Sequence, residues 1–179
     1  MSRVRIVGGK WRSRLLEVAS VPGLRPTPDR VRETVFNWLG QDLTGMAVLD
    51  LFAGTGAMGF EAASRGASKV TMVEQSSAAC AALQQAVKTL QAEGVEIVRG
   101  DAVKFAATTS AGFDVIFLDP PYNKGLIERV EPLLAGMLTP GGWLYVEAER
   151  PMSELGPYNA VRRGKAGQVF YQLMQQGER

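Results

Sequence analysis

Residues 113–122 read Phe-Asp-Val-Ile-Phe-Leu-Asp-Pro-Pro-Tyr, an apolar run that stops at a carboxylate and two prolines. A short run of this kind indicates a strand that is buried on both faces, as in a parallel sheet covered by helices. Open α/β sheets bind their ligands beyond the carboxyl ends of the strands. We therefore expect residues 119–122 to lie at the ligand-binding edge of such a sheet.

The tetrad Asp119-Pro120-Pro121-Tyr122 suits the recognition of a planar base that carries an exocyclic amine. The carboxylate can accept hydrogen bonds from the amine, the two prolines stiffen the backbone and remove two N–H donors, and the tyrosine ring can stack on the base. We predict that these four residues form the catalytic clamp of a nucleic-acid methyltransferase. A plain turn at the end of a strand is the alternative, because Asp and Pro are common in turns.

Strands and helices alternate along the rest of the chain. Apolar segments predict strands at residues 46–52, 69–74, 95–99, 113–118 and 143–148. Helices are predicted at residues 57–65, after Ser76, after Asp101 and at 126–138, and residues 159–163 and 168–174 are expected to pair as a closing hairpin. This alternation predicts a doubly wound, mostly parallel α/β sheet. If the first and fourth strands are neighbours, the segments that follow them meet at one edge.

The first strand leads into a glycine-rich loop at residues 54–59. Glycines there let the backbone approach a ligand closely before the next helix begins. Glu74 ends the second strand, where it can accept both hydroxyls of a ribose, and Asp101 follows the third strand, where it can meet an adenine edge or simply cap a helix. The predicted cofactor-binding residues are Asp50, Phe52, Ala53, Gly54, Thr55, Gly56, Glu74, Gln75, Asp101, Ala102 and Asp119.

The glycine loop alone does not separate a nicotinamide dinucleotide from S-adenosylmethionine, because residues 54–59 satisfy the pattern G-x-G-x-x-G. Three acids favour S-adenosylmethionine. Asp50 precedes the glycines, where it would repel a pyrophosphate but not a sulfonium-bearing amino acid, Asp101 follows the third strand, and Asp119 begins the tetrad. The chain also lacks histidine, which hydride-transfer enzymes often use as acid or base. A sulfonium methyl group needs chiefly an aligned nucleophile.

The composition is that of one globular domain, with 179 residues of which 46% are hydrophobic and 21% charged. The single cysteine cannot close an internal disulfide, the first residues lack the apolar stretch of a signal peptide, and no segment approaches the roughly 20 apolar residues of a membrane span. We therefore expect a cytoplasmic protein with no membrane partner and no metal. Cys80 falls on the apolar face of its helix, which disfavours a cytosine-C5 methyltransferase with a nucleophilic thiol.

The charge is unevenly distributed along the chain. The net charge is only +2, but residues 1–40 hold eight Lys and Arg against three Asp and Glu, a balance of +5. Such a segment can neutralise phosphates and bind nucleic acid without regard to sequence, although a solvated basic face with no partner is the alternative. The predicted RNA-binding residues are Arg5, Lys10, Trp11, Arg12, Arg14, Arg25, Arg30 and Arg32.

Residues 1–40 are expected to fold as a hairpin followed by a helix. β-branched residues before Gly8 and Gly9 favour the hairpin. Thr27 is expected to cap a helix that has Pro28 as its first residue and ends at Gly40. We predict two parts, an RNA-binding extension at residues 1–40 and a methyltransferase domain at residues 41–179.

These motifs together resemble those of class I S-adenosylmethionine-dependent methyltransferases. The resemblance lies in Asp-Leu-Phe-Ala-Gly-Thr-Gly at residues 50–56, Glu74, Gly100-Asp101 and the tetrad at 119–122. The front of the chain is more specific. Residues 5–12, Arg-Ile-Val-Gly-Gly-Lys-Trp-Arg, and residues 24–37, Leu-Arg-Pro-Thr-Pro-Asp-Arg-Val-Arg-Glu-Thr-Val-Phe-Asn, resemble the 16S rRNA (guanine(966)-N2)-methyltransferase family. The resemblance covers nearly the whole chain, including residues 166–169.

This resemblance implies a seven-stranded sheet in the order 3-2-1-4-5-7-6 and S-adenosylmethionine as the methyl donor. It also implies that the acceptor is the N2 of one guanine of 16S rRNA, within an assembled or assembling small ribosomal subunit. Two other classes stay open. One is a DNA adenine-N6 or protein glutamine methyltransferase with the same clamp, and the other is an RNA-binding or assembly module with a vestigial cofactor pocket. The short chain disfavours the first, because little of it is left to select a target, and the intact loop and acids disfavour the second.

Overall fold

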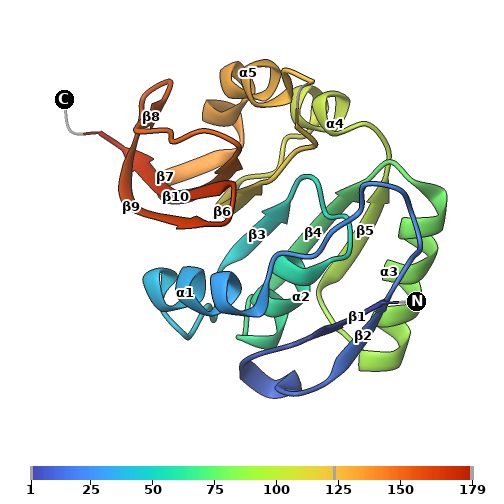
Figure 1. Ribbon diagram of the computed structural model, residues 1–179. Coiled ribbons are helices and arrows are strands. Elements are labelled where there is room, and N and C mark those ends of the chain that lie inside the picture. The colour runs from blue at the N-terminus through green and yellow to red at the C-terminus, as the bar shows by residue number, and fades with distance from the viewer. Residues whose placement is uncertain (1, 123, 178–179) are drawn as a thin grey trace.

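The computed structural model describes residues 2–122 and 124–177. An eight-stranded sheet forms the centre of the molecule (Figure 1). Its strands are β3 (Ala47–Asp50), β4 (Lys69–Glu74), β5 (Val95–Arg99), β6 (Phe113–Leu118), β7 (Leu138–Ala148), β8 (Glu154–Leu155), β9 (Tyr158–Ala166) and β10 (Val169–Gln176). Their order across the sheet is β5-β4-β3-β6-β7-β10-β9-β8.

The sheet is doubly wound and mostly parallel, as the sequence predicts. β3 pairs in parallel with β4 and β6, β4 with β5, and β6 with β7, whereas β10 runs antiparallel to both β7 and β9 as the closing hairpin. Without β8, the strands counted along the chain follow the expected order 3-2-1-4-5-7-6. The expectation of seven strands is wrong by one, because β8 adds two residues to the edge at β9. A strand of two residues is too short to carry an apolar alternation.

Helices cover both faces of the sheet (Figure 1). The helices on one face are α1 (Asp29–Leu39), α2 (Ala57–Ser64) and α3 (Ser77–Leu90), and those on the other are α4 (Ala102–Thr108), α5 (Leu126–Val130) and the 3-10 helix η2 (Glu131–Gly136). Two hydrophobic clusters correspond to these faces. Phe117 and Tyr145 belong to the first cluster, and their chain neighbours Leu118 and Val146 belong to the second. Successive residues of β6 and β7 therefore point to opposite faces.

The helix expected at residues 126–138 is shorter than the prediction. Only Leu126–Val130 is α-helical, the next turn is 3-10, and β7 begins at Leu138 rather than at residue 143. Pro132 explains the interruption, because proline has no N–H to donate and its ring clashes with the carbonyl four residues earlier.

Helix α1 begins one residue later than the prediction. Its N-cap is Pro28, and no side chain caps it. Thr27, the expected cap, is buried, and its side chain forms a hydrogen bond with Glu147 at the edge of the sheet. A tertiary contact has therefore replaced the local one. The helix ends at Gly40, as predicted.

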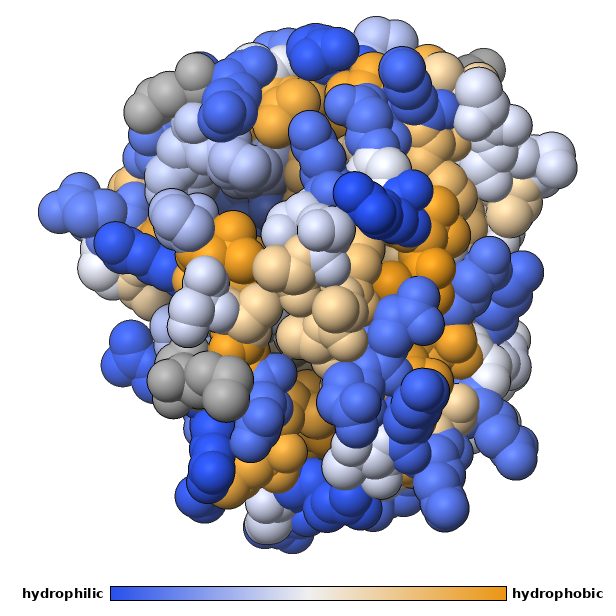
Figure 2. All heavy atoms as spheres, turned by 90° about the vertical axis from the view of Figure 1, so that its right-hand side faces the viewer, coloured by the Kyte–Doolittle hydropathy of each residue, from blue (hydrophilic) through white to orange (hydrophobic). Residues whose placement is uncertain are grey.

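The expected N-terminal hairpin is present. β1 (Ser2–Arg5) pairs antiparallel with β2 (Leu15–Val18), and the short 3-10 helix η1 (Gly9–Trp11) lies between them. The hairpin packs on the side of α2 and α3 (Figure 1), and its buried residues belong to the same hydrophobic cluster as that face of the sheet. The two predicted parts thus share one core, and their separate roles stay a prediction. Figure 2 shows the face that carries α3, where hydrophilic side chains dominate the margins and apolar atoms gather near the middle.

Candidate active site

The carboxyl ends of β3 and β6 lie side by side, because these strands are neighbours in the sheet (Figure 1). Asp50 pairs with Phe117 in the register of the two strands. The glycine loop after β3 and the tetrad after β6 therefore leave the sheet at the same edge, at the topological switch point where such folds bind ligands. The expected meeting of these two segments is confirmed.

Two glycines of the loop have backbone conformations that other residues rarely adopt. The φ angle is +55° at Gly54 and +79° at Gly56. A Cβ atom on Gly56 would lie 2.6 Å from Cδ2 of Leu83, so this position has no room for a side chain. Gly56 is also the N-cap of α2. The loop therefore turns sharply into the helix, as expected of a nucleotide-type loop.

Glu74 at the end of β4 is tied to the glycine loop. Its Oε1 accepts a hydrogen bond from the N–H of Gly54 at 3.1 Å, and its Oε2 accepts one from the N–H of Ser76 at 2.7 Å. Each carboxylate oxygen has a second lone pair, so the group can still accept hydrogen bonds from a ribose. The position matches the prediction, and the ribose contact stays a prediction.

Asp50 is buried beneath the loop, with 3% of its surface exposed. Its Oδ2 accepts a hydrogen bond from the N–H of Gly59 at 3.1 Å. Burial raises the pKa of Asp50 to about 7, although the Gly59 hydrogen bond opposes this shift, and the charge of Glu74 adds to it. A cationic ligand nearby would favour the ionised form of this carboxyl group.

Asp101 caps helix α4, since its Oδ1 accepts a hydrogen bond from the N–H of Lys104 at 2.9 Å. The capping alternative is therefore confirmed, and contact with an adenine edge stays a prediction. The other predicted cofactor contacts are distributed over the same edge: Phe52, Ala53 and Thr55 follow β3, Gln75 is exposed after β4, and Ala102 begins α4.

The four residues of the tetrad differ in exposure. Pro120 is buried and Asp119 is half-buried, whereas Pro121 and Tyr122 are exposed. Tyr122 is 41% exposed. Partial burial, followed by the charges of neighbouring carboxylates, raises the pKa of Tyr122 to about 12, so the phenol stays neutral at physiological pH. An exposed, uncharged ring at this edge suits stacking on a base.

Glu147 of β7 is a buried carboxyl group beside Asp119 that was not among the predicted site residues. It is 6% exposed, and its side chain forms hydrogen bonds with those of Asp119, Tyr145 and Thr27. Burial, followed by the charge of Glu147, raises the pKa of Asp119 well above its ordinary value. The sequence held a signal, since an acid interrupts the apolar strand at residues 144–148 and a buried charge needs a partner.

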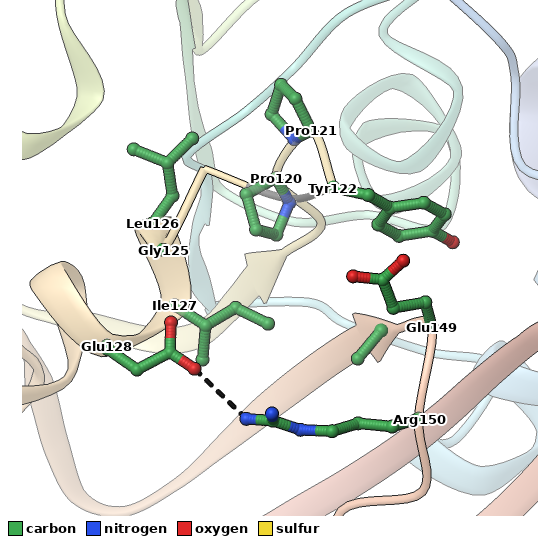
Figure 3. A pocket seen from close by; sticks show the side chains of 10 residues that line it. Pro120, Pro121, Tyr122, Gly125, Leu126, Ile127, Glu128, Glu149 and Arg150 are labelled. Atoms are coloured by element: carbon green, nitrogen blue, oxygen red, sulfur yellow. Dashed lines mark hydrogen bonds and ion pairs between the residues drawn. The ribbon is translucent and has the colours of Figure 1, made fainter.

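A pocket of about 290 Å³ opens beside the tetrad, between residues 120–122, 125–128 and 148–150 (Figure 3). Arg150 and Glu128 form an exposed ion pair in it, with 3.0 Å from Nη2 to Oε1. Figure 3 also shows the carboxylate of Glu149 next to the ring of Tyr122. The pocket lies toward α5, whereas the alternation along β6 turns Asp119 toward the face of α1 and α2. The pocket and the Asp119 carboxyl therefore lie on opposite sides of the tetrad backbone.

Comparison with known proteins agrees with this geometry. A family model described as Conserved hypothetical protein 95 matches residues 4–175. Ribosomal RNA small subunit methyltransferase D of Escherichia coli (strain K12) is 41% identical over 184 residues, covering 98% of this chain and 93% of that protein. The protein of the same name from Haemophilus influenzae is 39% identical, covering 96% of this chain and 93% of its own length. The chain therefore belongs to the family of ribosomal RNA small subunit methyltransferase D.

Solved structures share the fold of the family. A methyltransferase from Escherichia coli superimposes with a TM-score of 0.89 at 40% identity, covering 99% of this chain and all of that one. A 16S rRNA N2 G1207 methyltransferase from Thermus thermophilus, solved with AdoMet and guanosine, gives a TM-score of 0.75 at 22% identity. It covers 99% of this chain and 50% of that one, and at this identity the likeness shows the fold alone.

Six of the predicted RNA-binding residues are exposed, namely Arg5, Lys10, Arg12, Arg14, Arg25 and Arg30. Arg12 lines a second, polar pocket of about 370 Å³ between the hairpin loop, α1 and the end of α2. The hairpin loop is fixed there by a hydrogen bond of 3.0 Å from the N–H of Trp11 to Oγ of Ser64. Helix α2 has 8 residues and begins at the glycine loop, so Arg12 lies roughly 12 Å along the helix from the active edge. RNA contact at these six residues stays a prediction.

The expectation that Arg32 contacts RNA is wrong for this structure, because its side chain is 1% exposed. Its Nη1 donates to Oε1 of Glu61 at 2.8 Å and to the carbonyl of Arg5 at 2.7 Å, and its Nε donates to the carbonyl of Thr27 at 3.1 Å. Asp29 also accepts from its Nη2. The guanidinium thus joins the hairpin, the segment before α1 and helix α2.

The expectation that Trp11 stacks on RNA is also wrong for this structure. Trp11 is 7% exposed and belongs to the hydrophobic cluster beneath the hairpin, with Nζ of Lys10 4.8 Å from the centre of its ring. A large apolar ring gains more from burial than from exposure, and here the hairpin packs it against the domain.

The segment before α1 reaches the active edge, which the distribution of charge does not predict. Cδ1 of Leu24 lies 3.1 Å from the position that a Cβ on Gly54 would take, and the side chain of Thr27 forms a hydrogen bond with Glu147. Residues 24–27 therefore touch both the glycine loop and the partner of Asp119. The only sequence signal for this contact was the family-specific stretch at residues 24–37.

Within residues 2–122 and 124–177, no three His, Cys, Asp or Glu side chains are grouped so that they could hold a metal ion. In the same part of the chain, every helix is too short or too polar to cross a membrane.

Proposed function

We propose that this chain transfers a methyl group from S-adenosyl-L-methionine to the exocyclic N2 of one guanine in the 16S rRNA of the small ribosomal subunit. The observation that carries the proposal is the meeting of the Gly54 loop and Asp119 at one sheet edge, in a chain of this family. A donor bound on the loop and a base held by the tetrad would then adjoin. The products are S-adenosyl-L-homocysteine and N2-methylguanine.

The charge at this edge supports a cationic donor. Asp50, Glu74 and Asp119 end or follow three neighbouring strands, and Glu147 lies behind Asp119. A sulfonium ion and an α-ammonium group are attracted by such a field, whereas a pyrophosphate is repelled. After transfer the sulfonium has become a neutral thioether, so the attraction weakens and the product is released more easily than the substrate.

The acceptor guanine leaves its stack and lies on the ring of Tyr122. Its amine donates hydrogen bonds to the Asp119 carboxyl group and to the carbonyl of Pro120, which aligns the nitrogen with the methyl group on sulfur. The amine lone pair is delocalised into the base, so these acceptors favour a more tetrahedral nitrogen as positive charge builds on it. The N–C bond forms as the S–C bond breaks, and solvent takes the proton.

The six predicted RNA-binding residues that are exposed bind the rRNA, so residues 1–40 act as the RNA-binding extension. The substrate is an assembled or assembling small subunit, because basic residues bind phosphates without regard to sequence and ribosomal structure must then present the target. Such a substrate places the enzyme in the cytoplasm.

Methyl transfer from labelled S-adenosylmethionine to purified small subunits tests the proposal. We expect the label in 16S rRNA, recovered as N2-methylguanosine after digestion, with none in duplex DNA or in protein. Primer extension on the methylated subunits then locates the guanine. Label recovered as N6-methyladenine or methylglutamine would replace the proposal by its alternatives, and failure to bind the cofactor in calorimetry would indicate a vestigial pocket.

A further inference from the structure

Asp119 and Glu147 occupy equivalent places on neighbouring strands. In the parallel pairing of β6 with β7, Leu118 lies opposite Val146, so the next residues of the two strands adjoin at the carboxyl edge. Both follow the alternation that turns them toward the face of α1 and α2. Their side chains lie within hydrogen-bonding distance of each other.

The groups that surround this pair are acidic or neutral. The hydroxyl of Tyr145 donates to Oε2 of Glu147 at 3.4 Å. The charges that act most strongly on the ionisation of Asp119 are those of the carboxyl groups of Glu147 and Asp50. The titratable and polar groups that face it are Tyr145 within β7, Asp50 from β3, Thr27 from the segment before α1, and Tyr122 and Glu149 at the outer rim.

Glu147 is buried and Asp119 is half-buried, and two carboxyl groups in contact at such a place resist ionising together because like charges repel strongly where water is scarce. Burial raises the pKa of both Asp119 and Glu147. Such a pair can hold one proton between its two groups, as the hydrogen of a carboxyl-carboxylate hydrogen bond. That bond uses one oxygen of Asp119 and leaves the other able to accept a hydrogen bond from a ligand.

We propose that Glu147 is a positioning residue for Asp119, and that a single proton shared by the two carboxyl groups fixes the Asp119 side chain with its other oxygen toward the acceptor nitrogen. The hydrogen bonds from Tyr145 and Thr27 hold Glu147 in turn. This inference rests on the proposed function, because the acceptor nitrogen is the N2 of the guanine. Glu147 itself touches no reacting atom.

The arrangement lasts only while the pair keeps its proton. When that proton leaves at alkaline pH, two negative carboxylates repel and Asp119 moves out of alignment, so the rate of methyl transfer should fall. A glutamine at position 147 would donate an N–H to Asp119 that cannot titrate. An alanine would donate nothing.

Single-turnover methylation of purified small subunits by the wild type, Glu147→Gln and Glu147→Ala tests this inference across neutral and alkaline pH. We expect Glu147→Ala to lower the rate constant on the order of 10²-fold, as misalignment does, with cofactor affinity within a few-fold. Glu147→Gln should keep most of the neutral rate and lose the alkaline fall. Glu154→Gln, an exposed change on β8, is the matched control and should keep the wild-type profile.

Infrared spectroscopy gives a second readout that does not depend on activity. At about pH 8.5 Asp50, with its pKa of about 7, is largely ionised, and the protonated-carboxyl band of the pair should vanish in Glu147→Gln and in Asp119→Asn. If the wild type shows the protonated-carboxyl band but does not methylate subunits, the proposed function is contradicted, whereas the shared proton is supported. Methylation with an unaltered alkaline fall in Glu147→Gln, or a band that survives in both variants, would overturn the inference. If Glu147→Ala does not fold, the pH profile and the infrared band of the nearly isosteric Glu147→Gln still test the inference.

Discussion

Asp119 is the side chain on which the proposed chemistry depends most. Asp119→Ala should lower turnover by on the order of 10³-fold or more, because it removes the acceptor that orients the amine and stabilises the developing charge. Cofactor affinity should stay within a few-fold, since the glycine loop and Glu74 are untouched. Single-turnover methylation and calorimetry measure the two quantities. An equal decrease in both would show that Asp119 chiefly holds the cofactor.

Asp50 should make the stability of the free protein depend on pH. Burial raises its pKa from 3.8 in the unfolded chain to about 7, so the native state binds more protons than the unfolded state between these values. Its stabilising effect is complete below 3.8 and is lost as pH rises through 7. Asp50→Asn should therefore gain stability over the wild type as pH rises, by up to about 4 kcal/mol at alkaline pH. Urea unfolding at acid and alkaline pH measures this, and parallel curves for the two proteins would refute it.

Single residues show which features of the site could be predicted from the sequence and which could not. Glu74 and Asp101 lie at the positions predicted for them, because the sequence shows where an apolar strand ends. Arg32 looked like a surface cation, but Glu61, 29 residues away, accepts its hydrogen bond in the core. Glu147 was missed for the same reason, since the partner that explains its burial lies on another strand. Local pattern locates a residue along the chain, and only the fold supplies its partners.

The bounds of strands and helices were predicted well where the burial of apolar side chains determines them. The strands Lys69–Glu74, Val95–Arg99 and Phe113–Leu118 have the predicted bounds. Burial on both faces determines the residues of the first and the third, whereas Val95–Arg99 is a partly buried strand at the edge of the sheet. The start of helix α1 was misplaced, because Thr27 forms a tertiary hydrogen bond with Glu147 instead of capping the helix. The helix predicted at residues 126–138 was too long, because Pro132 interrupts it.

Helix α2 is attached to the hairpin through Glu61, and this attachment should dominate the stability of the front of the chain. The carboxylate is fully buried and accepts hydrogen bonds from the N–H groups of Val7 and Gly8 and from the guanidinium groups of Arg32 and Arg65. Glu61→Ala should cost about 3–5 kcal/mol, because it leaves two cations buried without their partner. Urea unfolding measures this decrease in stability.

The control for that variant is Glu93→Ala, an exposed acid beyond α3, which should change the free energy of unfolding by less than about 0.5 kcal/mol. If the two variants unfold at the same urea concentration, the buried cluster does not hold the hairpin to α2.

At the scale of the whole molecule, the family resemblance supplied the order of seven strands, and the alternation of elements sufficed for a doubly wound, mostly parallel sheet. It did not suffice for the placement of the extension. The hairpin loop lies at the far end of α2, whereas residues 24–27 lie at the active edge, so a basic segment adjacent in sequence is divided between two places.

That division predicts how the enzyme holds its substrate. Arg12 and Arg14 are both exposed and lie away from the active edge. If they neutralise rRNA phosphates, reversing both charges should weaken subunit binding. The slope of log K against log salt concentration should also become shallower, by roughly one unit for each phosphate that is no longer neutralised. The rate constant of bound complexes should be unchanged, because the tetrad is not altered. The matched control reverses Lys104 and Arg129, exposed on the opposite face of the sheet, with the same change in net charge. Filter binding across a salt series separates the two, and equal slopes for both variants would mean that only net charge matters and that the hairpin lies off the RNA path.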